Sequence, residues 1–257
     1  QAGGGNPEGL VPFEVEVSNV APGRDMLAYL LAFLLPMLLV VMCVMGAFFP
    51  AVDLTAGEKE RSTAETTLLL PIPRLAVHQG KILAVCVSAL SAAALNLAAL
   101  GLSVGHLFDL LSGGALALSG FPLLALVSLF PLALLFSFFA SSVLTGLAAL
   151  AQSFKEGQAL LGPVQIVFIV PALVGVIPGI ELTPGLCLVP VVNVALAFRA
   201  LLLGQTLPAQ YALVALSLLL YGLLAMRAAM WLLGREDFFF AGPGRRLRLW
   251  RGIAHGS

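Results

Sequence analysis

Five long apolar stretches constrain this chain more than any other feature of its sequence. Each is long enough to cross the hydrocarbon core of a bilayer, which takes about 20 residues of helix. They cover residues 26–49, 82–104, 122–152, 159–177 and 209–233. Prolines inside them are compatible with membrane helices, because neighbouring helices can satisfy the freed carbonyls. The predicted fold is therefore an all-α membrane protein, a polytopic bundle of transmembrane helices with five spans.

The composition agrees with a lipid environment. Of the 257 residues, 60% are hydrophobic and 10% are charged, whereas soluble domains carry about a quarter charged residues. The mean hydropathy is +1.04. Basic and acidic residues number 13 each, so the net charge predicts no nucleic-acid partner. The lipid bilayer is the expected surrounding, and the isolated Cys43, Cys86 and Cys187 fit small apolar positions in it.

The basic residues predict an orientation. If the first of five spans runs from outside to inside, most Lys and Arg residues fall on the inner side, as the positive-inside rule requires. A sixth apolar stretch, 186–203, contains Pro190, Asn193 and Arg199. A sixth span there would place the Arg-rich tail on the wrong side. We therefore expect residues 178–205 to form a re-entrant or interfacial helical hairpin on the outer face.

The remaining regions lie at the two ends of the chain. Residues 1–25 are expected to be the end of an extracytoplasmic segment, with a strand where Phe13, Val15 and Val17 alternate with polar residues. The transmembrane domain covers residues 26–233, and residues 234–257 form a basic tail expected on the cytoplasmic side. Arg227 lies about two turns from the inner end of the last span, where its side chain is expected to snorkel toward the headgroups.

The loop between the first two spans, Asp53 to Lys81, carries the densest run of charges. Thr55 and Glu58 fit a capping box that would start a helix over about 55–70. The spacing predicts ion pairs of Arg61 with Glu58 and with Glu65. An amphipathic helix of this kind either rests on headgroups or docks on a soluble partner, and the spacing alone leaves both readings open.

This loop resembles the signature of ABC-2-type permeases, specifically the sodium-export (NatB-like) group. The matching residues are Asp53, Thr55-Ala56-Gly57-Glu58-Lys59-Glu60-Arg61, Thr63, Glu65-Thr66, Leu68-Leu69, Pro71, Arg74 and Gly80-Lys81. Supporting matches occur at Ser153-Phe154-Lys155-Glu156 with Gln158, at residues 178–182 and 188–194, and at Arg235-Glu236-Asp237. The resemblance covers roughly residues 15 to 240. Ser62 replaces the usual Gly, which removes a backbone-permissive position, and Ala64 replaces a usual Leu.

The resemblance implies the membrane subunit of an ATP-driven exporter in a bacterial or archaeal cell (inner) membrane. The helix at 55–70 would be a coupling helix that docks on a separate ATPase subunit, which would hold ATP and Mg, so this chain needs no cofactor of its own. A second permease copy or paralogue is also implied, as are an earlier span and an outer domain before residue 1. The residues expected to couple to the ATPase are Glu58, Lys59, Glu60, Arg61, Glu65 and Arg74.

The expected outer hairpin supplies Glu181, Asn193 and Arg199 as candidates for a gate or a cation path. Glu181 would meet a cation or pair with Arg199, and Asn193 is expected to satisfy broken backbone. No acidic residue lies at the centre of a span, so sodium as cargo rests on the resemblance alone. A peptide, a drug-like amphiphile or a lipid stays open as cargo.

Two other classes of membrane protein stay open as alternatives. An intramembrane enzyme, such as a protease, needs a nucleophile or metal constellation. His78, His106 and His255 lie far apart in the sequence, and HExxH does not occur. A secondary transporter would favour buried charges at mid-membrane depth. The Gly80-Lys81 pair lacks the upstream Gly of a P-loop, so we expect no ATP hydrolysis by this chain.

Overall fold

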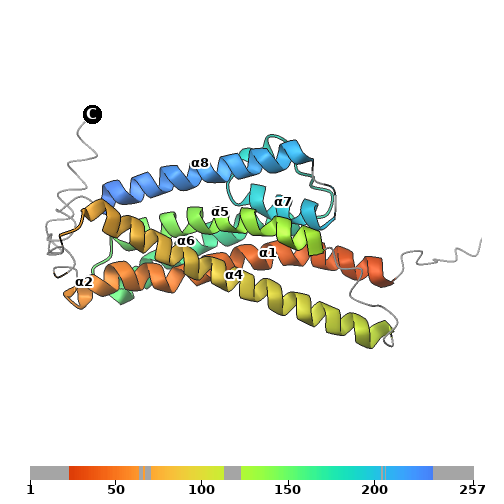
Figure 1. Cartoon of the computed structure of the whole chain (residues 1–257), viewed down its shortest axis with the longest axis horizontal. Coiled ribbons are helices and arrows are strands. Elements are labelled where there is room, and N and C mark those ends of the chain that lie inside the picture. Colours follow the sequence, from red (N-terminus) through yellow and green to blue (C-terminus); the bar gives the residue numbers. More distant parts are fainter. Residues whose placement is uncertain are drawn as a thin grey trace, which may run out of the picture.

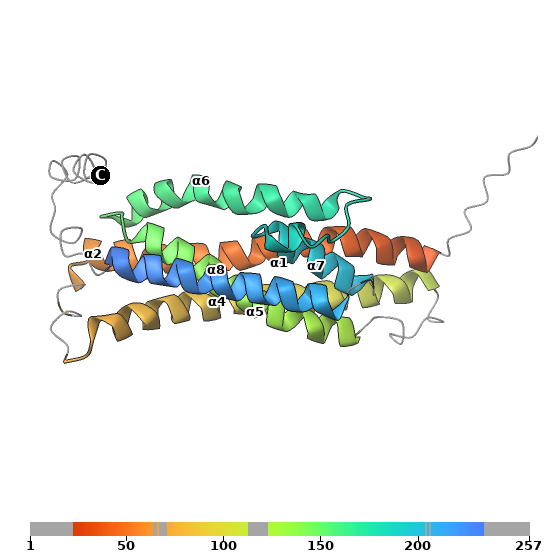
Figure 2. The same ribbon diagram turned by 90° about the horizontal axis from the view of Figure 1, so that it is seen from above.

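The computed structural model describes residues 23–63, 66, 71–112, 123–203, 205 and 207–233. Five long helices run side by side along the length of the molecule (Figures 1 and 2). They are α1 (Gly23–Val52), α4 (Arg74–Ser112), α5 (Leu123–Ala148), α6 (Phe154–Ala172) and α8 (Pro208–Leu233). The strand expected near residues 13–18 and the tail from residue 234 lie outside the described residues, which contain no strand.

The five helices confirm the predicted helical membrane bundle. The stretches 33–60, 75–100, 128–148, 154–176 and 208–232 are long and apolar enough to cross a membrane. Several helices extend beyond the predicted apolar stretches. The 39 residues of α4 begin at Arg74 rather than near Ile82, which gives a rod of about 58 Å against a hydrocarbon core of about 30 Å. Polar residues therefore continue the helix beyond the apolar part.

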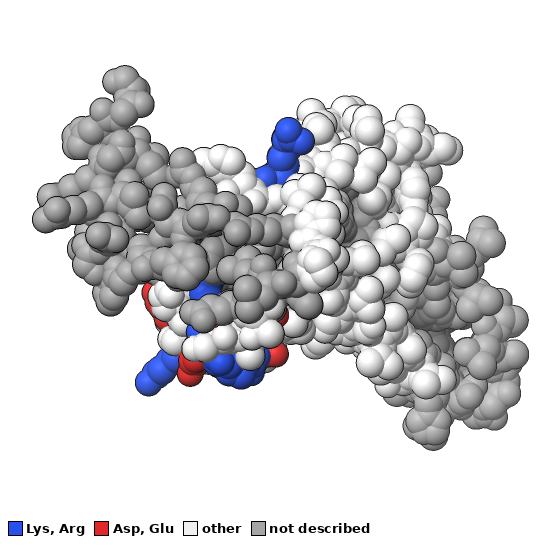
Figure 3. All heavy atoms as spheres, turned by 60° about the vertical axis from the view of Figure 1, so that its left-hand side comes forward, with Lys and Arg blue, Asp and Glu red and all other residues white. Residues whose placement is uncertain are grey.

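The helices alternate in direction, and charge gathers where three of them end. In Figure 1, α1, α5 and α8 run toward the end of the molecule that carries α2, while α4 and α6 run away from it. Figure 3 shows Lys, Arg, Asp and Glu clustered at that end. We call it the charged end, formed by residues 53–63, 71–81 and 149–156, and call the opposite end the far end.

Short elements occupy the far end between α6 and α8. They are the 3-10 turns η4 (Leu173–Val176) and η5 (Leu186–Leu188) and the helix α7 (Val192–Leu202). The 11 residues of α7 span about 16 Å, roughly half of a bilayer core. Val191, which precedes α7, has φ 72° and ψ −52°. A β-branched residue with positive φ is a conformational outlier, so the chain enters α7 through a strained turn.

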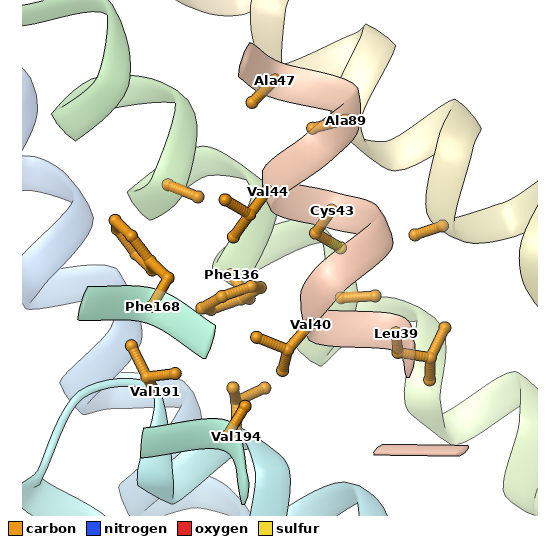
Figure 4. Close-up of a cluster of buried hydrophobic side chains, with 14 of the residues drawn as sticks. Leu39, Val40, Cys43, Val44, Ala47, Ala89, Phe136, Phe168, Val191 and Val194 are labelled. Carbon is orange, nitrogen blue, oxygen red and sulfur yellow. The ribbon is translucent and has the colours of Figure 1, made fainter. Parts of the chain in front are cut away.

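The core forms around α1, which packs against α4, α5, α6 and α7. Val40 and Val44 of α1 are fully buried and lie close to Phe136 of α5 and Phe168 of α6 (Figure 4). The two rings meet edge to face, with centroids 6.3 Å apart, a geometry that aromatic pairs prefer. These contacts hold α1, α5 and α6 around one apolar centre.

Glycines set the closest helix contacts. A Cβ on Gly46 of α1 would lie 2.6 Å from the Cβ of Ala92 on α4, and one on Gly146 of α5 would lie 2.8 Å from that of Ala229 on α8. Ser88 of α4 also donates a hydrogen bond to the Gly46 carbonyl at 3.0 Å. Small residues let helix backbones approach closely, which matters in lipid because packing replaces the hydrophobic effect between helices.

Two Gly→Ala substitutions test this packing. Gly46→Ala should lower the free energy of unfolding by about 1–3 kcal/mol, because α1 and α4 must separate. The matched control is Gly80→Ala in α4, whose added methyl meets nothing within 4 Å and should gain up to about 1 kcal/mol of helix propensity. Denaturant titration in detergent, followed by circular dichroism, measures both. Equal shifts at the two sites would contradict the close α1–α4 contact.

Candidate functional site: the charged end

The charged end begins with an unbroken extension of α1. The helix continues through a π-helical turn, η2 (Asp53–Gly57), into α2 (Glu58–Glu60). Thr55 is buried and donates its hydroxyl hydrogen to the Ala51 carbonyl at 2.6 Å. The predicted capping box at Thr55 and Glu58 is therefore wrong, because an N-cap needs extended backbone and free amide groups. Residue 55, where the helix was predicted to start, lies instead inside η2, the π-helical turn that continues α1.

The helix ends at Glu60, with Arg61 as its C-cap, and the chain turns at Ser62. The Ser62 amide donates to the Lys59 carbonyl at 3.2 Å, and Ser62 has φ 57°, in the left-handed region. Helices often end with such a residue, and glycine is favoured there because it has no Cβ. The departure noted in the sequence, Ser62 in place of Gly, thus falls where the chain turns. Residues 64, 65 and 67–70, which include Glu65, lie outside the described residues.

Lys59 and Glu60 bind the ends of two other helices. Lys59 donates to the carbonyls of Ala149 and Ala151, just past the end of α5. The Glu60 carboxylate accepts the Phe154 amide, the first of α6, at 2.6 Å. The last carbonyls and first amides of helices lack intrahelical partners. A cation is favourable at a helix C-terminus and an anion at an N-terminus, so each charge lies at the helix end that suits it.

The start of α6 also satisfies its own amides. Ser153 is the N-cap, and its side chain accepts the Glu156 amide at 3.2 Å. The Glu156 carboxylate accepts the Gln152 amide at 2.8 Å. The sequence signal was present, because Ser-Phe-Lys-Glu has the spacing of a capping box. These residues were matched to the permease signature, but their capping role was not predicted.

Two ion pairs differ from those predicted. Glu58 pairs with Lys81 of α4, whose ammonium also donates to the Leu54 carbonyl at 2.8 Å. Arg61 pairs with Asp53 at 2.9 Å. The predicted Glu58–Arg61 pair is wrong, because Glu58 pairs with Lys81 of α4 and Arg61 pairs with Asp53. The Glu58 and Lys81 side chains are 19% and 16% exposed, against 49% and 57% for Asp53 and Arg61.

The charged end therefore has an internal and an external set of charges. Glu58, Lys59 and Lys81 hold helices together, whereas Arg61, Lys155 and Glu156 are exposed. Asp53 pairs with Arg61 at the surface. Arg74 begins α4 at this end, and its side chain lies outside the description. Of the predicted coupling residues, the structure brings Glu58, Lys59, Glu60 and Arg61 together at the end of one helix.

The three predicted far-end residues do not form one site. Asn193 is buried, and its amide donates to the Cys187 carbonyl at 3.1 Å and the Ser217 hydroxyl at 2.9 Å. It thereby serves the backbone, as expected, and ties α7 to α8. Glu181 is exposed. Arg199 faces other partners, so Asn193 and Arg199 lie on the same helix without sharing a contact in the described part of the chain.

Arg199 is buried without a carboxylate partner among the described residues. Its guanidinium donates to the Ile177 carbonyl at 2.7 Å and lies 4.3 Å from the centroid of the Phe33 ring of α1. Burial lowers the pKa of Arg199, and the charge of Glu181 opposes that shift. The expected Glu181–Arg199 pairing is thus an electrostatic influence rather than a direct ion pair. Carbonyls and a ring face hold this cation instead.

One comparison with known proteins gives a partial match. The protein described as "ABC transporter permease protein NatB" of Bacillus subtilis (strain 168) is 38% identical over 76 residues. This stretch is 30% of the present chain and 20% of the relative, so most of that relative has no counterpart in the match. No family model matches the chain. No solved structure matches it either. The chain is related over this stretch to an ABC transporter permease.

Replacing Ser62 by Gly tests the turn that ends the extended helix. Ser62→Gly should raise the free energy of unfolding by about 1 kcal/mol, because glycine adopts positive φ without the steric cost that a Cβ brings. Ser103→Gly on the exposed face of α4 is the control and should lose about 0.5–1 kcal/mol of helix stability. Denaturant titration measures both, and a loss of stability in Ser62→Gly would contradict the left-handed turn.

Double-mutant cycles separate the internal ion pair from the external one. Glu58→Gln and Lys81→Gln should show a coupling free energy of about 1–3 kcal/mol, because the pair is largely buried and joins two helices. Asp53→Asn and Arg61→Gln should couple by less than about 1 kcal/mol, because exposed pairs are screened by solvent. Unfolding free energies of single and double variants give both values. Equal couplings would refute the distinction between the two pairs.

Proposed function

We propose that this chain is the membrane subunit of an ATP-driven exporter whose charged end docks on a separate ATPase subunit. The partial match to an ABC transporter permease supports this function, as do five helices long enough to span a bilayer. The observation that carries the docking role is the extension of α1 beyond its apolar part. It ends in charges that hold α4, α5 and α6, so a force applied there acts on four helices together.

The proposed docking surface is the external set of charges, Asp53, Arg61, Lys155 and Glu156. These side chains carry both signs, which suits a complementary protein surface better than a purely anionic or cationic one. Glu58, Lys59 and Lys81 would transmit the motion rather than contact the partner. Rigid ion pairs and backbone hydrogen bonds suit that role, because they keep the helix ends in register while the whole group tilts.

In the proposed mechanism, the external charges contact the ATPase subunit and the internal charges transmit its motion to the helices. The ATPase subunit would bind ATP and Mg, and its closure would push the charged end. Because the helix is continuous from α1 through η2 to Glu60 in α2, the push would tilt it as one rod instead of bending a loop. The exporter would need two permease copies, identical or paralogous, in a bacterial or archaeal cell membrane with the charged end in the cytosol. Glu181, Asn193 and Arg199 would lie at the outer side, where α7 would gate the path.

Sodium is the proposed cargo, and only the group that the sequence resembles supports it. Uptake of radioactive sodium into inverted membrane vesicles, with the ATPase subunit present, tests this choice separately from the docking role. ATP-dependent sodium uptake is the expected result. ATP-dependent activity on a peptide, a drug-like amphiphile or a lipid, without sodium movement, would retain the exporter and replace its cargo.

Charge reversal at the external set tests the docking role. The double variant Arg61→Glu with Lys155→Glu should reduce recovery of the ATPase subunit with the tagged chain by about tenfold or more, because like charges across an interface cost several kcal/mol. Its unfolding free energy should change little, since exposed charges contribute little to stability. Co-purification from native membranes measures the first quantity and denaturant titration the second.

Glu181→Lys is the matched control, because it reverses one exposed charge at the far end. It should leave ATPase recovery unchanged. Equal recovery with the double variant and the unaltered chain would rule out the proposed docking surface. Glu58 is unsuitable for this experiment, because reversing it would also break its contact with Lys81 and disturb the bundle itself.

A further inference from the structure

Arg227 occupies an unusual place on α8. Its side chain is exposed on a helix face that also carries Leu216, Leu220 and Leu223, which are 63%, 55% and 46% exposed. These residues recur at intervals of three or four, which aligns them along one face. A face of exposed leucines in a membrane bundle meets hydrocarbon, so a cation within it needs a specific partner.

The depth of Arg227 brings that partner within reach. Arg227 lies six residues before Leu233, the last residue of α8, which is about 9 Å along the helix. A long arginine side chain can extend over that distance toward the headgroups at the charged end. Trp231 follows one turn later on the same face and is 60% exposed. Tryptophan is enriched at the level where acyl chains meet headgroups.

Within the described part of the chain, no acidic side chain forms an ion pair with Arg227. The ion pairs between described residues, Asp53 with Arg61 and Glu58 with Lys81, both lie at the charged end. A guanidinium binds phosphate through parallel hydrogen bonds, and net attraction to a lipid surface requires an anionic lipid. The leucines below Arg227 offer an apolar track for acyl chains along the same helix face.

We propose that Arg227 binds the phosphate headgroup of an anionic phospholipid in the leaflet at the charged end, with Trp231 beside the lipid and the acyl chains lying along Leu216, Leu220 and Leu223. The arginine supplies the charge selectivity. The tryptophan fixes the depth, because its ring lies at the border of the headgroup region. The site needs neither the ATPase subunit nor a cargo, so its test is independent of the proposed function.

Tryptophan fluorescence can locate the lipid directly. The chain has two tryptophans, so Trp250→Phe leaves Trp231 as the only one. The protein is placed in phosphatidylcholine vesicles that contain equal fractions of either brominated phosphatidylglycerol or brominated phosphatidylcholine, whose bromines quench a neighbouring indole. Phosphatidylglycerol should be enriched about fivefold beside Trp231, which corresponds to about 1 kcal/mol for one basic residue near an anionic lipid.

Three further variants assign the selectivity to Arg227. Arg227→Gln should bring the two lipids to equal quenching, whereas Arg227→Lys should keep most of the preference. Lys155→Gln removes an exposed cation from the charged end without touching this face of α8, and it should keep the full preference. Circular dichroism of each variant checks that the helical fold is intact.

Several outcomes would overturn the proposal. Equal quenching by the two lipids in the Trp250→Phe protein would show no anionic site. A preference that survives Arg227→Gln would assign it to the general charge of the molecule. Quenching by neither lipid would place Trp231 against protein, and a change of oligomeric state in Arg227→Gln would then identify this face as an interface between copies.

Discussion

The charged end depends on one interaction, the reach of Lys59 and Glu60 to the facing ends of α5 and α6. The carbonyls of Ala149 and Ala151 and the amide of Phe154 have no helical partners, and buried backbone groups are costly when unpaired. Adjacent residues of opposite charge satisfy both helix ends from one short segment. The sharp connection between α5 and α6 is stable because α1 extends far enough to meet it.

Hydropathy alone predicted the five long helices, because the length of an apolar run depends on the bilayer and not on tertiary contacts. The charged end was harder to predict. Thr55 has the local sequence pattern of a helix start. In the structure, Val52 and Ala56 lie one turn apart on a continuous helix and both pack close to Gly157 of α6. Lys81 lies 23 residues from Glu58, so no local spacing rule could pair them. The cap at Ser153 and Glu156 was readable from sequence.

Among the described residues, two that are not glycine have positive φ, and each lies where one element gives way to another. Ser62 ends the extension of α1 with φ 57°, and Val191 starts α7 with φ 72°. Strained backbone persists only where surrounding contacts enforce it. At α7 these contacts include the amide of Asn193 with Cys187 and Ser217. The resemblance marked Ser62 in advance through its missing glycine, whereas no pattern in the sequence marks Val191.

The continuity of α1 has a mechanical consequence. Phe33, beneath the Arg199 guanidinium, and Lys59, beside the end of α5, belong to the same rod and lie about 39 Å apart along it. A rod of that length acts as a lever arm. A rotation of about 5° around one end moves the other end sideways by about 3 Å. A shift of that size would separate the Phe33 ring from the Arg199 guanidinium. A displacement at the Lys59 end of this helix would therefore change the contacts at its Phe33 end directly, without movement of the connecting loops.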